Sequence, residues 1–149
     1  MGNRYIVKQN NVNPTAGNDI LTIVSASSRR GRLVQVSVNG RGSTSAAQQI
    51  EIGRSSSGSS TSNGTVTPGK FDHTDQPAAA FIYNNLLSAQ PNLDTNTEVL
   101  GWNALGGANR YIPPRGQALE IRNGEQISIR ATTGVTFQNL SLTVVTEED

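Results

Sequence analysis

The chain has 149 residues, no cysteine and a net charge of +1, with 34% hydrophobic and 15% charged residues. This length fits a single domain, and the aliphatic content is high enough to bury a core, which excludes a disordered chain. Without cysteine the chain can form no disulfide, no thiolate metal site and no cysteine nucleophile.

The pattern of the N-terminal segment does not predict a targeting signal. It lacks the continuous apolar run of a secretion signal, and nowhere in the chain do about 18 apolar residues follow one another, as a membrane span requires. We therefore expect a soluble, unprocessed protein with no membrane partner.

The first third of the chain predicts short β-strands. Valine, isoleucine, leucine and threonine recur in brief runs between glycine, asparagine, proline and serine, a pattern typical of strands joined by turns. Residues 19–24 read as one strand. Residues 32–38 alternate and predict a second strand with Val34, Val36 and Val38 on one face.

The stretch GRSSSGSSTSNG, residues 53–64, follows a further short strand predicted at residues 49–52. It contains six serines, three glycines and no apolar side chain. If it were a linker, the preceding residues would have to fold alone from about four strands, which is marginal for an isolated sheet. We therefore expect an exposed loop within one domain that covers residues 1–149.

The middle of the chain is ambiguous between helix and strand. Residues 78–87 follow a candidate helix cap at Asp75, but the aromatic and branched side chains of residues 81–83 suit a strand, which we favour. Near the C-terminus, residues 135–145 alternate again and predict a strand, followed by an acidic tail at residues 147–149.

Residues 118–130 show the clearest alternation. Their apolar side chains occupy odd positions on both sides of Asn123 and Gly124. A two-residue hairpin loop would place apolar against polar side chains, so we expect a three-residue loop with Gly124 in the left-handed conformation and Leu119 opposite Ile127.

These segments together predict the fold class. Eight or nine short alternating runs, no βαβ rhythm and no long helix favour an all-β antiparallel β-sandwich, and a jelly roll is the natural candidate at this length.

Charge is unevenly distributed along the chain. Residues 1–70 hold eight basic and two acidic residues, whereas residues 71–149 hold four basic and nine acidic ones. Two interpretations are open. Opposite fields can steer neighbouring copies or partners into register, or the sheet topology can bring both halves together and cancel the asymmetry.

No pattern in the sequence predicts catalysis. His73 is the only histidine, and with Asp72 and Asp75 it offers at most part of a metal site, so we interpret this segment as a polar turn. No nucleophile elbow and no phosphate-binding loop are present. We expect no enzyme, no cofactor and no metal site.

Arg29, Arg30 and Arg32 form a basic patch between two predicted strands. Arginines in such a cluster suit phosphates or the carboxylates of a protein. Aromatic residues make up only 5% of the chain, and no stacking platform accompanies the arginines. We predict a protein-facing or solvated patch and no nucleic-acid partner.

Carbohydrate binding is the main alternative from the residues. Jelly-roll sandwiches often carry it, and Trp102, Tyr83 and Tyr111 offer aromatic faces for stacking on sugars. A lone tryptophan in an alternating run equally fits the core.

Three stretches carry a resemblance: RYIVKQNNVNPTAGNDILTIVSASSRRGRLVQVSV, the serine-rich stretch, and YIPPRGQALEIRNGEQISIR. In size, strand order and turn style the chain resembles the small jelly-roll decoration, or cement, proteins of tailed-phage capsids. The resemblance implies a non-enzymatic virion structural protein, synthesised in the host cytoplasm. It implies a homotrimer on the outer capsid surface that bridges major capsid subunits.

The resemblance also suggests where the capsid would be contacted. We expect a short N-terminal arm of about residues 1–11 to contribute Arg4, Tyr5 and Lys8, with residues 5–7 as an edge strand the alternative. The second expected contact is the turn with Arg29, Arg30 and Arg32. A carbohydrate-binding jelly-roll module and a phage tail or fibre receptor-binding domain remain the alternative functions.

Overall fold

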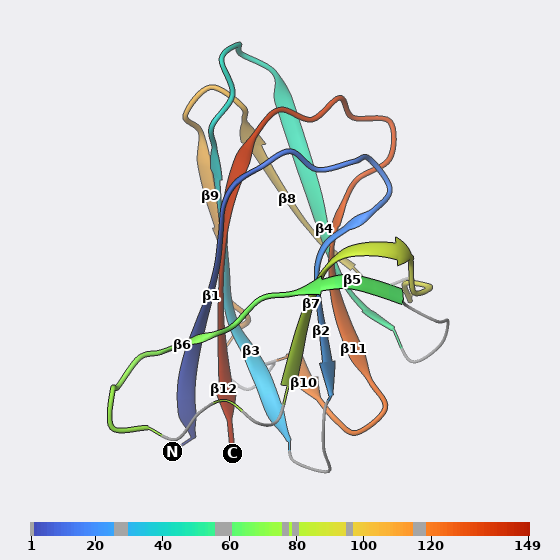
Figure 1. The fold of residues 1–149 in the computed structure, drawn as a ribbon. Coiled ribbons are helices and arrows are strands. Elements are labelled where there is room, and N and C mark those ends of the chain that lie inside the picture. Colours follow the sequence, from blue (N-terminus) through green and yellow to red (C-terminus); the bar gives the residue numbers. More distant parts are fainter. Residues whose placement is uncertain are drawn as a thin grey trace.

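The structure, a computed structural model, describes residues 2–25, 30–55, 61–75, 78, 81–94, 97–114 and 119–149. In these ranges the chain forms two antiparallel sheets that pack face to face, and no helix (Figure 1). The predicted all-β antiparallel β-sandwich is confirmed.

We call the first layer sheet A, which lies on the left in Figure 1. Its strands follow the order β10-β3-β12-β1-β6, and β9 pairs with β3 along the same edge as β10. The strands are β1 (Asn3–Val12), β3 (Gly31–Gly40), β6 (Gly69–Lys70), β9 (Ala108–Tyr111), β10 (Leu119–Ile121) and β12 (Leu140–Glu148).

The second layer, sheet B, has the strand order β5-β7-β2-β11-β4-β8. Its strands are β2 (Asp19–Ser25), β4 (Ala47–Ser55), β5 (Thr61–Thr65), β7 (Phe81–Ala89), β8 (Thr97–Asn103) and β11 (Gln126–Ala131). The strands predicted over residues 19–24 and 49–52 are confirmed as parts of β2 and β4. The strand predicted over residues 78–87 is confirmed from Phe81 onward, where β7 begins.

The connectivity is that of a jelly roll. Most successive strands lie in different layers, and strands from the two ends of the chain pair in succession: β1 with β12, β2 with β11, β3 with β9 and β10, and β4 with β8. This nested antiparallel pairing wraps into two sheets. The segment between β4 and β8 adds β6 to the edge of β1, β7 to the edge of β2, and β5 beyond β7.

The core fills the space between the sheets. Alternation along each strand turns every second side chain inward, so branched side chains from both layers meet. Sheet B contributes Leu21, Ile23 and Ile129, and sheet A contributes Val36 and Leu142, all of them fully buried.

A bulge in β3 corrects the predicted face of that strand. Val145 lies opposite Gln35, but the next residue, Thr146, lies opposite Leu33, so Val34 is the extra residue. The bulge turns Leu33 into the core, whereas Val34 is only half-buried. The expected row of valines therefore holds for Val36 and Val38 but not for Val34.

The expected hairpin over residues 118–130 is wrong. β10 pairs with β3 in sheet A, whereas β11 pairs with β2 and β4 in sheet B, so the segment crosses from one layer to the other. The turn itself is as predicted: Gly124 has a φ of 83°, and Glu125 N–H donates to the Arg122 carbonyl at 3.0 Å. Leu119 and Ile127 lie in different sheets.

The N-terminal residues form a strand rather than an arm. β1 pairs with β12 from Asn3 to Val12, and Tyr5 and Ile6 also pair with β6 on the other side. The alternative of an edge strand is closer to the structure, because β6 covers only two residues of that edge.

The loop in the serine-rich stretch is shorter than expected. β4 continues to Ser55 and β5 begins at Thr61, so both ends of the expected loop belong to strands. The remaining residues of the expected loop, 56–60, lie outside the described residues.

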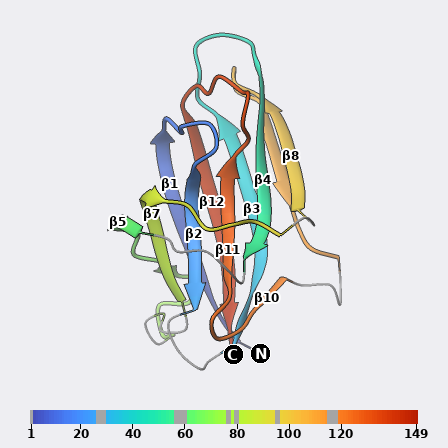
Figure 2. The same cartoon turned by 90° about the vertical axis from the view of Figure 1, so that its right-hand side faces the viewer.

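A segment after β7, residues 90–94, crosses the outer face of sheet B, and we call it the strap. Figure 2 shows it passing in front of β2, β11 and β4. Asp94 N–H donates to the Arg54 carbonyl of β4 at 2.9 Å, and Pro91 is buried. Thr22 and Ser128 on the strands beneath are fully buried.

A buried ion pair holds the strap in place. Arg130 of β11 donates from Nε to Asp19 Oδ1 at 2.6 Å and from a second guanidinium nitrogen to the Pro91 carbonyl at 2.6 Å. The Asp19 side chain has no exposed surface and also accepts a hydrogen bond from Thr22 Oγ1 at 2.6 Å. The Gln90 side chain accepts from the Asp19 backbone N–H at 2.7 Å.

Arg130→Met should destabilise the fold strongly, because it leaves the Asp19 carboxylate buried without its cation. We expect a loss of about 3–5 kcal/mol in the free energy of unfolding. Arg122→Met is the matched control: its ion pair with Glu120 is more than half exposed, so the loss should stay below about 1 kcal/mol. Urea unfolding measures both losses. Equal midpoints for the two variants would contradict a stabilising role of the buried ion pair between Arg130 and Asp19.

Candidate functional site

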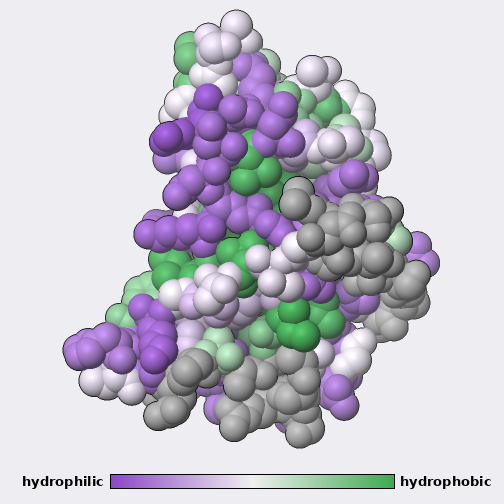
Figure 3. All heavy atoms as spheres, viewed as in Figure 1, coloured by the Kyte–Doolittle hydropathy of each residue, from purple (hydrophilic) through white to green (hydrophobic). Residues whose placement is uncertain are grey.

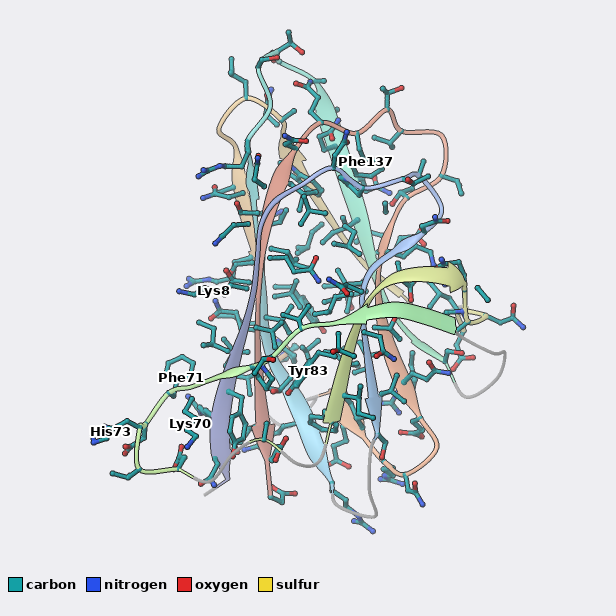
Figure 4. All side chains as sticks on the ribbon, in the orientation of Figure 1. Lys8, Lys70, Phe71, His73, Tyr83 and Phe137 are labelled. Carbon is teal, nitrogen blue, oxygen red and sulfur yellow. The ribbon has the colours of Figure 1, made fainter. Side chains whose placement is uncertain are left out.

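The outer face of sheet A is the candidate site. On β1, alternation turns Tyr5 and Val7 into the core and leaves Arg4 and Lys8 exposed on the outside. Figure 4 shows Lys8 pointing away from the sandwich. Because β12 and β3 lie beside β1, their outward side chains share this face.

One row of charges crosses this face over four neighbouring strands. Arg4 on β1 lies opposite Glu147 on β12, Glu147 lies opposite Arg32 on β3, and Arg32 lies opposite Glu120 on β10. Positive and negative side chains therefore alternate across the sheet. We call these four residues the balanced row.

Glu147 is the centre of the balanced row. Its side chain is only 1% exposed, Arg4 Nε donates to Oε2 at 2.9 Å, and a guanidinium nitrogen of Arg32 donates to Oε1. Burial raises the pKa of Glu147, but the hydrogen bonds from Arg4 and Arg32 and their positive charges outweigh it, so the pKa lies below its ordinary value.

A second row lies further along the same face, over β1, β12, β3 and β9. Lys8 on β1 lies opposite Thr143 on β12, Thr143 lies opposite Ser37 on β3, and Ser37 lies opposite Arg110 on β9. This row has a cation at each end and two hydroxyls between them. We call these four residues the open row.

The open row lies in a broad depression of about 690 Å³. Most residues that line it are polar or basic, among them Asn39, Ser141, Lys8, Arg41 and Arg110. Figure 3 shows hydrophilic side chains gathered over β1 and β9 on this side of the molecule. No acidic and no aromatic side chain is among the described residues that line the depression.

The three cations of the depression are unpaired. Among the described residues, no carboxylate oxygen lies within 4.0 Å of the charged nitrogens of Lys8, Arg41 or Arg110. By contrast, both carboxylates of the balanced row are paired with arginines. Glu147 is paired with Arg4 and Arg32, and Glu120 with Arg122 at 3.3 Å.

The residues predicted for capsid contact have different locations. Arg4, Lys8 and Arg32 lie on the outer face of sheet A, and Arg30 is exposed immediately before β3. Tyr5 is 1% exposed and points into the core, so it is not part of this surface. Arg29 lies outside the described residues.

Sequence reasoning missed two cations of the depression, and it misread the acidic tail. Arg41 follows β3 directly and Arg110 lies on a short edge strand, so only the strand register brings them near Lys8. Glu147 belongs to β12, between two basic strands. The strand topology thus brings the basic and acidic halves of the chain together. This is the second of the two interpretations of the uneven charge given above.

His73 lies on an exposed turn beyond β6. Its side chain is 97% exposed, and its Nδ1 is 3.7 Å from the Asp72 carboxylate, beyond hydrogen-bond distance. Asp72 accepts hydrogen bonds from the backbone N–H and the hydroxyl of Thr74, as a turn-forming side chain does. The described residues contain no group of three or more potential metal ligands among histidine, cysteine, aspartate and glutamate.

The aromatic residues considered for sugar stacking are mostly in the core. Trp102 is 8% exposed and packs against Phe137, with ring centroids 6.5 Å apart. Tyr83 is 1% exposed; burial raises its pKa, and its hydroxyl is 2.7 Å from Thr146 Oγ1. Tyr111 is partly buried. Neither Trp102 nor Tyr83 presents a face to a ligand.

No protein-family model matches the chain, and no curated protein matches it. Over the part of the chain that the structure describes, no helix is long and apolar enough to cross a membrane.

Glu147→Gln should remove a pH-dependent part of the stability. Because the folded-state pKa of Glu147 lies below its ordinary value of 4.5, the carboxylate stabilises the fold above that pH. This contribution should be lost as the pH falls from about 4.5 through the lowered folded-state pKa. At pH 7 we expect the variant to be less stable by about 1–2 kcal/mol.

Urea unfolding of both proteins between pH 3 and pH 7 measures this difference. It should shrink as the pH falls. A difference that stays constant over this range would show that the Glu147 charge does not stabilise the balanced row.

Proposed function

We propose that the protein is a non-enzymatic virion structural protein that binds the outer surface of a phage capsid and bridges major capsid subunits. In this proposal the outer face of sheet A meets the capsid and the protein acts as a homotrimer. The resemblance to small jelly-roll decoration proteins motivates the proposal, and the jelly-roll connectivity of the chain agrees with it.

One observation carries the choice of face. The outer face of sheet B is crossed by the strap, whereas the outer face of sheet A carries an open depression with Lys8, Arg41 and Arg110 unpaired on it. Unpaired cations on a rigid sheet attract an anionic surface and orient it, and many weak contacts add up on a repetitive lattice.

The alternative of a carbohydrate-binding module has less support. That hypothesis depends on aromatic platforms, and Trp102 and Tyr83 are buried. A tail or fibre domain would share the fold and the open face, so the location of the protein in the virion distinguishes it from a capsid protein.

The test is attachment to phage heads. Heads of the phage that encodes this chain, assembled without it, are mixed with the purified protein and sedimented. We expect saturable co-sedimentation, density on the outer capsid surface by electron microscopy, and a native mass of three 15.8 kDa chains for the free protein.

Urea unfolding supplies the control for folding: a variant that fails to bind must still unfold at the wild-type midpoint. A folded wild-type protein that does not attach to heads, or that attaches to tails instead, would contradict the proposal. A native mass of one chain would contradict the proposed homotrimer but not the proposed attachment to heads.

A further inference from the structure

We propose that the depression binds the carboxylates of an acidic protein segment, which pair with the cations Lys8 and Arg110 at the two ends of the open row. This inference specifies which chemical groups the outer face of sheet A would recognise on its partner. It rests on the proposed function for the identity of that partner, the capsid.

The comparison of the two rows is the first step. Both rows cross β1, β12 and β3 and end on a strand that pairs with the far edge of β3. In the balanced row, an acidic side chain follows each basic one across the sheet. In the open row, the position on β12 that corresponds to Glu147 is Thr143, and the cations Lys8 and Arg110 at the ends have no carboxylate.

The second step is the spacing. Neighbouring strands lie about 4.8 Å apart, so the backbones of Lys8 and Arg110 are about 14 Å apart across three strand spacings. An extended peptide advances about 3.3 Å per residue, so two acidic residues four positions apart span about 13 Å. An extended segment laid across the strands therefore presents carboxylates to both cations.

The third step is the chemistry of the floor and rim. A guanidinium such as that of Arg110 or Arg41 binds a carboxylate through two parallel hydrogen bonds. Ser37, Thr143 and the asparagine side chains of the lining can donate and accept hydrogen bonds, which suits the backbone of a peptide. The described lining has no aromatic side chain on which a base or a sugar ring would stack.

The chain itself supplies a sharp test. Thr143→Glu places a carboxylate directly opposite Lys8, which repeats the arrangement of Arg4 and Glu147. The new carboxylate should pair with Lys8 and compete with the carboxylates of an acidic peptide. We therefore expect the affinity for the peptide to fall about tenfold or more, while the stability of the fold is kept or raised. Thr143→Gln matches Thr143→Glu in size without the charge, so its affinity should stay clearly above that of Thr143→Glu, which separates the effect of the charge from that of the longer side chain.

The probe is a fluorescein-labelled hexaglutamate, with binding followed by anisotropy at low and high salt. We expect salt-sensitive binding that is weakened at least about tenfold by Thr143→Glu and by the double variant Lys8→Ala, Arg110→Ala. Lys70→Ala, an exposed cation outside the depression, should bind as the wild type does. Urea midpoints confirm that each variant is folded.

The outcomes separate this inference from the proposed function. If heads bind the wild type and Thr143→Glu equally, the inference is overturned and the function stands. If hexaglutamate binds as expected but heads do not, the function fails and the anion site stands. Tighter binding of hyaluronate than of hexaglutamate would overturn the peptide assignment. If the wild type self-associates and Thr143→Glu does not, the depression binds a second copy of the chain. That result would overturn the proposal that it binds an acidic segment of the capsid.

Discussion

The pairing of β12 with both β1 and β3 is the constraint on which sheet A depends. This C-terminal strand lies between two strands from the first third of the chain, so contacts such as Arg4 to Glu147 join residues 143 positions apart. Contacts of this range form only after a large loss of chain entropy, and the inner face of β12, with Leu140, Leu142 and Val144 fully buried, offsets that loss. The same insertion delivers acidic side chains to a basic neighbourhood, so packing and charge compensation depend on one strand.

The surface chemistry of the face follows from its register. Side chains that lie opposite one another on adjacent strands stand side by side, so a sheet displays its sequence as transverse rows. The row through Glu147 is internally compensated, and its buried carboxylate contributes to the fold. The row through Thr143 has the same backbone geometry but lacks the acidic members, so its cations are available to a ligand. A shift of the strands by one residue would turn these side chains inward, which makes the binding chemistry inseparable from the register.

The alternation of apolar residues predicted most strands and the sandwich, because burial on one face imposes a period of two. It could not identify the partner of a strand. Every strand of a sandwich turns alternate residues inward whichever layer it belongs to, so the pattern on either side of Gly124 fits a hairpin within one sheet as well as a crossing between two, and the crossing occurs. Likewise, Lys8 was recognised as basic, but its relation to Arg41 and Arg110 exists only once β9 is docked beside β3. Glu147 was misread because an acidic residue at the end of a strand is usually solvated, and here two arginines compensate its burial.

The strap makes the two sides of the molecule unequal. Arg130 and Asp19 fasten residues 90–94 across sheet B, and sheet A keeps its outer face open. If the outer face of sheet A binds a particle as proposed, each bound copy turns its strap-covered layer toward the solvent, so the outermost surface of the particle differs from the surface that made the attachment.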